Sequence, residues 1–184
     1  EAAFWMSEKF KAAGLLKLGE GWGQSLTTEN GTIGHNIIGL LPGSAKVHPD
    51  RYIIVGAHYD HLGMAGKRLY PGADANASGV VAMTSVAEML SITRSIGRSY
   101  NCNIIFAAFD AKEMNMEGSK RLWEAIAAGE LTDPVSGNPI TRNKIVFMVN
   151  IDQIGSGLAP LNKGREDYMI MLGNPNLKRS YNDM

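Results

Sequence analysis

From residue 51 onward, short apolar runs alternate with segments of helical periodicity, and this alternation limits the possible folds more than any other feature of the sequence. Such runs are typical of strands that are buried on both faces of a sheet. The expected strands span residues 51–60, 101–110, 144–152 and 167–173, and the expected helices span 80–92 and 117–129. The alternation predicts an α/β fold with three layers, in which a mixed, mostly parallel sheet is flanked by helices.

The first 43 residues contribute a helix and two further strands to this expectation. Residues 2–14 carry apolar side chains among charges and end at a glycine, which predicts an amphipathic helix. Residues 22–43 resemble two strands around Glu29, Asn30 and Gly31, a hairpin signal. Because a hairpin contributes antiparallel strands, the sheet is expected to be mixed.

The remaining segments complete one predicted domain, residues 1–184. Residues 62–79 are expected to form a glycine-rich loop, and residues 174–184 resemble the start of a helix. The residues of the 117–129 helix that are expected to face inward are Leu122, Trp123, Ile126 and Ala127. No repeat or linker divides the chain.

The composition of the chain favours some classes of protein and binding partner over others. Hydrophobic residues make up 45% and charged residues 20% of the chain, which favours a globular fold. The net charge is +0 without a basic run, so neither nucleic acid nor an anionic membrane surface is indicated. The apolar runs are too short for a membrane span. The one cysteine, Cys102, cannot form an intramolecular disulfide and is expected to be a small buried hydrophobe.

Polar side chains follow the predicted strands at the ends where ligands bind in open α/β sheets. His58 and Asp60 end the first strand, Glu113 lies beyond the second, and Asp152 ends the third. The loop before the first of these helices adds Asp74. Carboxylates and an imidazole suit zinc or another divalent metal. Taken singly, each residue also fits a structural role, as a hydrogen-bonded histidine or a turn or cap carboxylate.

Four segments together resemble one known group of enzymes. The segments VGAHYDHLG, PGADANASGV, FAAFDAKE with the EGS that follows, and VNIDQIG occur in this order. They resemble the zinc-dependent aminopeptidases of the bacterial leucyl aminopeptidase type, in a superfamily that includes plasma glutamate carboxypeptidases and glutaminyl cyclases. The resemblance implies a zinc-exopeptidase fold, a site for two zinc ions and hydrolysis of N-terminal peptide bonds.

Carried over by position, the resemblance leaves an incomplete metal site. It implies that His58, Glu113 and Asp152 are remnant metal ligands and that Asp60 orients His58. The family's metal-bridging aspartate corresponds to Ala75. Its general-base glutamate corresponds to Lys112, and its final histidine has no counterpart after Asp152.

These departures predict a degenerate, weakly active or inactive member that binds peptides or partners. An alternative is a single-metal hydrolase or glutaminyl-cyclase-like enzyme that uses Asp74, His61 or a ligand outside this chain. A catalytic zinc site needs three protein ligands and an open position, and zinc binding is therefore doubtful. A third interpretation is that this chain lacks the C-terminal part of the family fold. The resemblance also implies an extracellular or periplasmic location and, if the domain is active, a peptide or N-terminal amino acid as substrate.

Lys112 has two readings. Its ammonium could pair with Glu113 or Asp152 and stabilise a metal-free pocket, or it could point to solvent. Lys112 is a poor general base in either case, because a lysine is protonated at neutral pH and neighbouring carboxylates favour that form.

Overall fold

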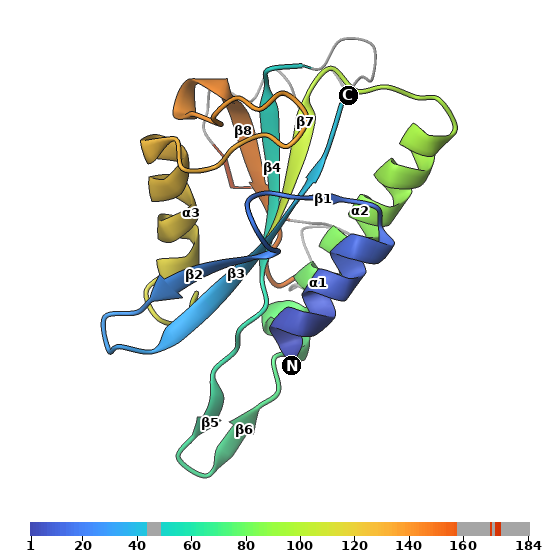
Figure 1. Cartoon of the computed structure of the whole chain (residues 1–184). Coiled ribbons are helices and arrows are strands. Elements are labelled where there is room, and N and C mark those ends of the chain that lie inside the picture. The colour runs from blue at the N-terminus through green and yellow to red at the C-terminus, as the bar shows by residue number, and fades with distance from the viewer. Residues whose placement is uncertain (44–48, 158–169, 171, 174–184) are drawn as a thin grey trace.

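The computed structural model describes residues 1–43, 49–157, 170, 172 and 173 of the chain. A sheet of six strands forms the middle layer, with α1 and α2 on one face and α3 on the other (Figure 1). The strands of this sheet are β1 (Leu16–Lys17), β2 (Gly23–Thr27), β3 (Ile33–Leu41), β4 (Tyr52–His58), β7 (Asn103–Phe109) and β8 (Ile145–Asn150). The helices are α1 (Ala2–Ala12), α2 (Gly79–Ser95) and α3 (Glu117–Ala128). The predicted three-layer α/β fold is therefore confirmed.

The sheet is mixed, as predicted. Its order is β1-β3-β7-β4-β8, with β2 also paired to β3. β7, β4 and β8 are parallel to one another, and β3 is antiparallel to β7 and to both short strands beside it. The hairpin of β2 and β3 around residues 29–31 supplies the antiparallel part, as the sequence indicated.

β7 separates two apolar clusters because successive side chains of a strand point to opposite faces. Phe106 packs with α1 and α2, and the ring of Phe10 meets it edge-on with centroids 6.4 Å apart. Ile105, one residue earlier, packs with Leu122 of α3 on the other face. Burying a side chain such as Phe10 contributes about 1.5–3 kcal/mol. The two clusters hold both helical layers against the same strands.

Three local predictions were wrong. Residues 62–79 are not a plain loop: they form a two-stranded hairpin of β5 (Gly63–Ala65) and β6 (Arg68–Tyr70) and a π-helical turn, η1 (Ala73–Ser78). β8 was expected to be buried, yet Val146, Met148 and Val149 are 40%, 43% and 42% exposed, because β8 is the last strand of the described sheet.

The third correction concerns α3. Its buried side chains include Leu122, Ala125 and Ile126, whereas Trp123 is 45% exposed. Trp123 and Ala127 lie outside the inward stripe, and the guanidinium of Arg142, in the 3-10 turn η2 (Arg142–Lys144), lies 5.1 Å from the centroid of the Trp123 ring. The fourth strand expected at 167–173 and the helix start at 174–184 lie almost wholly outside the described residues.

None of the helices in the described ranges has the length and apolar character that crossing a membrane requires.

Candidate functional site

The sheet itself brings the site together. β4, β7 and β8 run parallel, with His58 in register with Phe109 and Gly56 in register with Asn150. Because the carboxyl ends of parallel strands meet at the same edge of a sheet, the residues that follow these strands converge there. His58, Glu113 and Asp152 therefore gather from three separate parts of the chain.

His58 lies between two carboxylates. Its Nε2 is 3.4 Å from Oδ1 of Asp152, and its Nδ1 is 3.3 Å from Oδ1 of Asp60 and 3.0 Å from the Asp60 carbonyl oxygen. The imidazole is buried. Burial alone lowers the pKa of His58, but Asp60 and Asp152 outweigh it, so the pKa lies above its ordinary value. The carboxylate and the main-chain carbonyl of Asp60 thus both contact Nδ1 of His58.

Asp60 also links the ends of β4 and β7. Its Oδ2 accepts a hydrogen bond of 2.9 Å from the backbone N–H of Glu113. Burial raises the pKa of Asp60, but hydrogen bonds from His58 and from the backbone of Glu113 and Lys112 lower it below the ordinary value. Ala111, with φ of 53°, turns the chain sharply after β7 and so directs this backbone toward Asp60.

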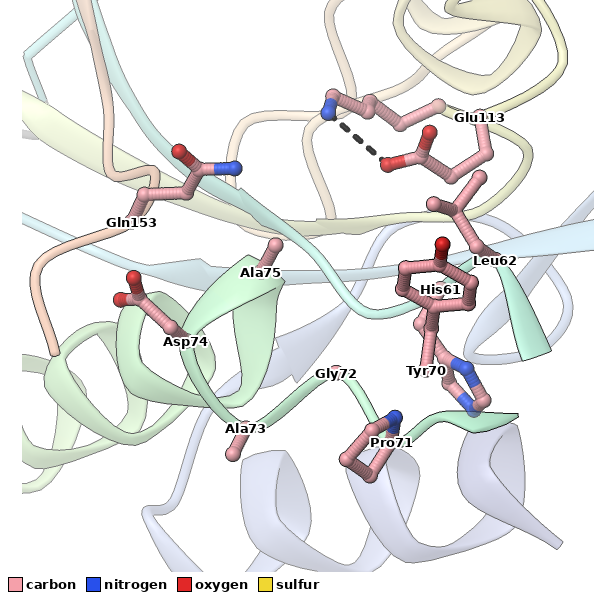
Figure 2. A pocket seen from close by; sticks show the side chains of 11 residues that line it. His61, Leu62, Tyr70, Pro71, Gly72, Ala73, Asp74, Ala75, Glu113 and Gln153 are labelled. Atoms are coloured by element: carbon pink, nitrogen blue, oxygen red, sulfur yellow. Dashed lines mark hydrogen bonds and ion pairs between the residues drawn. The ribbon is translucent and has the colours of Figure 1, made fainter. Parts of the chain in front are cut away.

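Lys112 pairs with its neighbour. Its Nζ donates to Oε1 of Glu113 at 3.0 Å, the contact drawn as a dashed line in Figure 2. The side chain of Lys112 is 31% exposed, so the ammonium is neither buried nor free in solvent. The hydrogen bond to Glu113 raises the pKa of Lys112, burial opposes it, and Glu113, Asp152 and Asp60 raise it further by their charge. The group is a cation at neutral pH, held among carboxylates.

Residues 72–79 are held to the end of β8 by hydrogen bonds of the Asn76 side chain. The buried amide of Asn76 donates to the carbonyl of Ile151 at 2.8 Å, and its Oδ1 accepts from the backbone N–H of Gly79 and of Gln153, both at 3.1 Å. This arrangement places Ala75 on the wall of the site (Figure 2).

The carboxylate of Asp74 accepts hydrogen bonds from residues that follow β8. Its Oδ1 accepts from the backbone N–H of Gly155 at 2.7 Å, and its Oδ2 accepts from the hydroxyl of Ser156. The hydrogen bond from Ser156, and then that from Gly155, hold the pKa of Asp74 below its ordinary value. The carboxylate of Asp74 thus holds residues 155 and 156 in place through hydrogen bonds.

A cavity of about 430 Å³ opens between these segments (Figure 2). It is lined by His61, Leu62, Tyr70, Pro71, Gly72, Ala73, Asp74, Ala75, Lys112, Glu113 and Gln153. Nδ1 of His61 accepts a hydrogen bond of 2.9 Å from the backbone N–H of Gly63, so a neutral His61 carries its proton on Nε2. The sequence reasoning missed Tyr70 and Gln153. Gln153 could have been found, because it directly follows Asp152 at a strand end.

Among the described residues, the donors at this edge of the sheet do not form a three-ligand metal site. Within the described ranges, no three histidine, cysteine or acidic side chains are grouped so that they could hold a metal ion. Nε2 of His58 has no hydrogen-bond partner there and faces Asp152, which gives two ligands where catalytic zinc sites have three. Glu113 is paired with Lys112 instead.

Comparison with known proteins gives the family. Residues 36–168 match the model of Peptidase family M28. The chain belongs to this family.

Among solved structures, the fold of this M28 chain resembles those of three bacterial proteins. LapB from Legionella pneumophila is 22% identical with a TM-score of 0.57, over 88% of this chain and 38% of that one. A Zn-dependent exopeptidase from Parabacteroides distasonis is 19% identical with a TM-score of 0.56, over 84% and 53%. The aminopeptidase from Aneurinibacillus sp. strain AM-1 is 25% identical with a TM-score of 0.51, over 67% and 25%.

Among curated proteins, the M28 chain is similar to the BOS complex subunit NCLN. The human protein is 30% identical and the chicken protein 29% identical over 106 residues. The match spans 57% of this chain and 18% of each relative. The chain therefore spans less than a fifth of the length of these relatives.

Proposed function

We propose that this M28 domain is a non-catalytic member of its family that holds its pocket together without metal and acts by binding a peptide segment of a partner protein. The observation that carries the proposal is the pair of Lys112 and Glu113, 3.0 Å apart, at the position where the resemblance implies a general base and a metal ligand. An ammonium at that point repels a divalent cation and competes for its remaining ligand.

Charge supports this reading. Relative to the family pattern, Ala75 removes one negative charge, and Lys112 removes another and adds a positive one. The two changes replace most of the positive charge that two divalent ions would bring. Asp60, Glu113 and Asp152 all act on the Lys112 ammonium and raise its pKa, so this cation stands among the carboxylates that metals would otherwise neutralise.

The domain also lacks the general base that this hydrolysis requires. Hydrolysis by zinc peptidases needs a group that accepts a proton from water, and Lys112 is held in its charged form by the same carboxylates. Loss of a general base alone typically lowers the rate by about 10²–10⁴. The loss of a metal-sharing carboxylate at Ala75 adds to this.

The comparisons support a binding role. The curated relatives named NCLN are described as subunits of a complex, while the solved neighbours are described as exopeptidases and aminopeptidases. One scaffold can serve either catalysis or binding, because function lies in the site and not in the fold.

The alternative is a single-metal hydrolase built on His58 and Asp152, whose third ligand is Asp74, His61 or a group outside this chain. Nε2 of His58 favours it, because within the described residues it has no hydrogen-bond partner and lies 3.4 Å from Oδ1 of Asp152. Against it, Asp74 is already held by Gly155 and Ser156.

Metal analysis with an activity assay separates the two. We expect purified protein that has been dialysed against zinc and then buffer to retain far less than one ion per chain and to leave an aminoacyl anilide intact. Stoichiometric zinc, with hydrolysis that a chelator abolishes, contradicts the proposal. If Asp74→Ala also abolishes that hydrolysis, the single-metal reading is the correct one.

A further inference from the structure

The hairpin of β5 and β6 stands away from the body of the domain and exposes apolar side chains. Figure 1 shows it projecting beyond the helices and the central sheet. Leu62, Met64 and Leu69 are 56%, 63% and 62% exposed. An isolated two-stranded hairpin is marginally stable, and exposed apolar side chains on one gain stability when they are covered.

The hairpin has two different faces. Met64 pairs directly with Leu69 across the two strands, so their side chains lie side by side on one face. Arg68 and Tyr70 flank Leu69 and therefore point to the opposite face. There the guanidinium of Arg68 lies 4.9 Å from the centroid of the Tyr70 ring, and Tyr70 lines the cavity (Figure 2). We call the side with Met64 and Leu69 the hairpin face; Leu62, just before β5, lines the cavity instead.

The hairpin is positive on a chain whose net charge is +0. Between Asp60 and Asp74 the sequence contains Lys67 and Arg68 and no acidic residue. A partner with carboxylates beside its apolar side chains would be attracted to this surface, and like-charged surfaces would be repelled.

The position of the charges indicates a protein and not a lipid surface. The turn at the tip consists of Gly66, with φ of 61°, and Lys67, so the end of the hairpin is polar and the apolar side chains lie on its flat side. Insertion of the tip into a bilayer would carry Lys67 into the hydrocarbon region at a cost. Docking of the flat side against another protein leaves Lys67 at the rim, in contact with water and carboxylates, while Arg68 stays on the opposite face against Tyr70.

We infer that the hairpin face binds a segment of a partner protein that presents a row of apolar side chains flanked by aspartate or glutamate. The inference rests on the proposed function, in that it names the surface through which a non-catalytic domain would act. The two are separable, because zinc binding contradicts the proposed function and leaves the composition of bound peptides unaffected.

The test selects peptides from a random library displayed on phage against the intact chain. Enriched peptides are synthesised and their affinity is measured by fluorescence anisotropy. We expect them to combine leucine, isoleucine or phenylalanine with acidic residues. The double variant Met64→Ser/Leu69→Ser should weaken binding about tenfold or more. Lys67→Glu/Arg68→Glu should also weaken it, and added salt should weaken binding to the wild type.

The matched control is Ile92→Ser, which removes an apolar side chain that is 64% exposed on α2. It should leave peptide affinity unchanged, and circular dichroism should show that all variants keep their fold. Enriched peptides without acidic residues, no enrichment, or full affinity in the Met64→Ser/Leu69→Ser variant overturns the inference.

Two further measurements test whether something other than a partner protein covers the hairpin face. A dimer in sedimentation equilibrium that Met64→Ser/Leu69→Ser dissociates would show that a second copy of this chain covers the face. Binding to phosphatidylserine vesicles that the same variant loses would show a lipid surface. Either result overturns the inference, and a monomer that ignores vesicles supports it.

Discussion

The side-chain amide of Asn36 on β3 donates a hydrogen bond of 2.7 Å to the carbonyl of Gly118 in the first turn of α3. Asn36 is fully buried, and its Oδ1 accepts from the backbone N–H of Asp110 at 3.1 Å. The glycine of the EGS segment thus lets the helix approach the sheet closely, directly after the turn that carries Lys112 and Glu113.

Gly118→Ala should destabilise the domain, because the added methyl group would meet the carbonyl of Asp110 and Oδ1 of Asn36 well inside contact distance. The cost should be about 1–3 kcal/mol, measured by urea unfolding. Gly21→Ala is the control, since the nearest atom to its added methyl group lies 3.9 Å away. Equal stability of the two variants would show that the close approach is not required.

Asn76→Ala should also destabilise the domain, because it removes the ties from η1 to Ile151 and Gln153 at the end of β8. Leaving these partly buried main-chain groups without partners should cost about 1–3 kcal/mol in urea unfolding. Asn143→Ala, at an exposed asparagine, should stay within about 0.5 kcal/mol of the wild type. An Asn76 variant as stable as this control would mean that the segment is held by other contacts.

The positions of His58 and Asp152 could be predicted from the sequence, and the partner of Lys112 could not. The lengths of the apolar runs and their parallel order place His58 and Asp152 at one edge of the sheet. Lys112 has a long side chain that could reach Glu113, Asp152 or solvent. The turn at Ala111, with positive φ, decides the outcome, and an alanine carries no signal for that conformation.

The errors in the fold have similar causes. β5 and β6 are three residues each, too short for an alternating pattern to show. The apolar run of β8 looks the same whether the strand is central or at the end of the described sheet. The helical stripe of α3 was predicted too broadly, because Trp123 is apolar by composition but lies between the inward and outward faces.

The difference in stability between the wild type and Tyr52→Phe should depend on pH, because only the wild type has the buried Tyr52 hydroxyl. Tyr52 donates a hydrogen bond of 2.5 Å to Asp133. Burial, and then Asp133, raise the pKa of Tyr52 well above its ordinary value. A raised folded-state pKa stabilises the protein fully below the unfolded value of about 10, and this contribution is lost as the pH rises beyond it.

The wild type should therefore be more stable than Tyr52→Phe by about 1–2 kcal/mol near pH 8, and the difference should shrink by about pH 11. Urea unfolding at both pH values measures it. Tyr70→Phe, at a half-buried tyrosine that lines the cavity, should differ from the wild type by about 0.5 kcal/mol or less near pH 8. A Tyr52→Phe difference that grows with pH would contradict the assignment.

Lys112→Gln should lower stability by up to about 1 kcal/mol at low ionic strength, because it removes the one positive charge that faces Glu113, Asp152 and Asp60 together in the described part of the site. The loss should decrease in high salt, which screens the repulsion that remains. Lys120→Gln is the matched control, since the one ion pair of Lys120 within the described residues is with Glu117, at 3.2 Å on the surface of α3. Its effect should be about 0.3 kcal/mol. If the two variants behave alike, Lys112 has no special role in the pocket.

The most direct test of the central claim is a calorimetric zinc titration of the wild type beside the double variant Ala75→Asp/Lys112→Glu. By the resemblance, Ala75→Asp supplies the family's metal-bridging carboxylate, and Lys112→Glu replaces the ammonium by the family's general base, so a third ligand becomes available. We predict no saturable zinc binding by the wild type at micromolar concentration and binding at least about tenfold tighter by the variant. Tight stoichiometric binding by the wild type, or an unchanged affinity in the variant, would contradict the account.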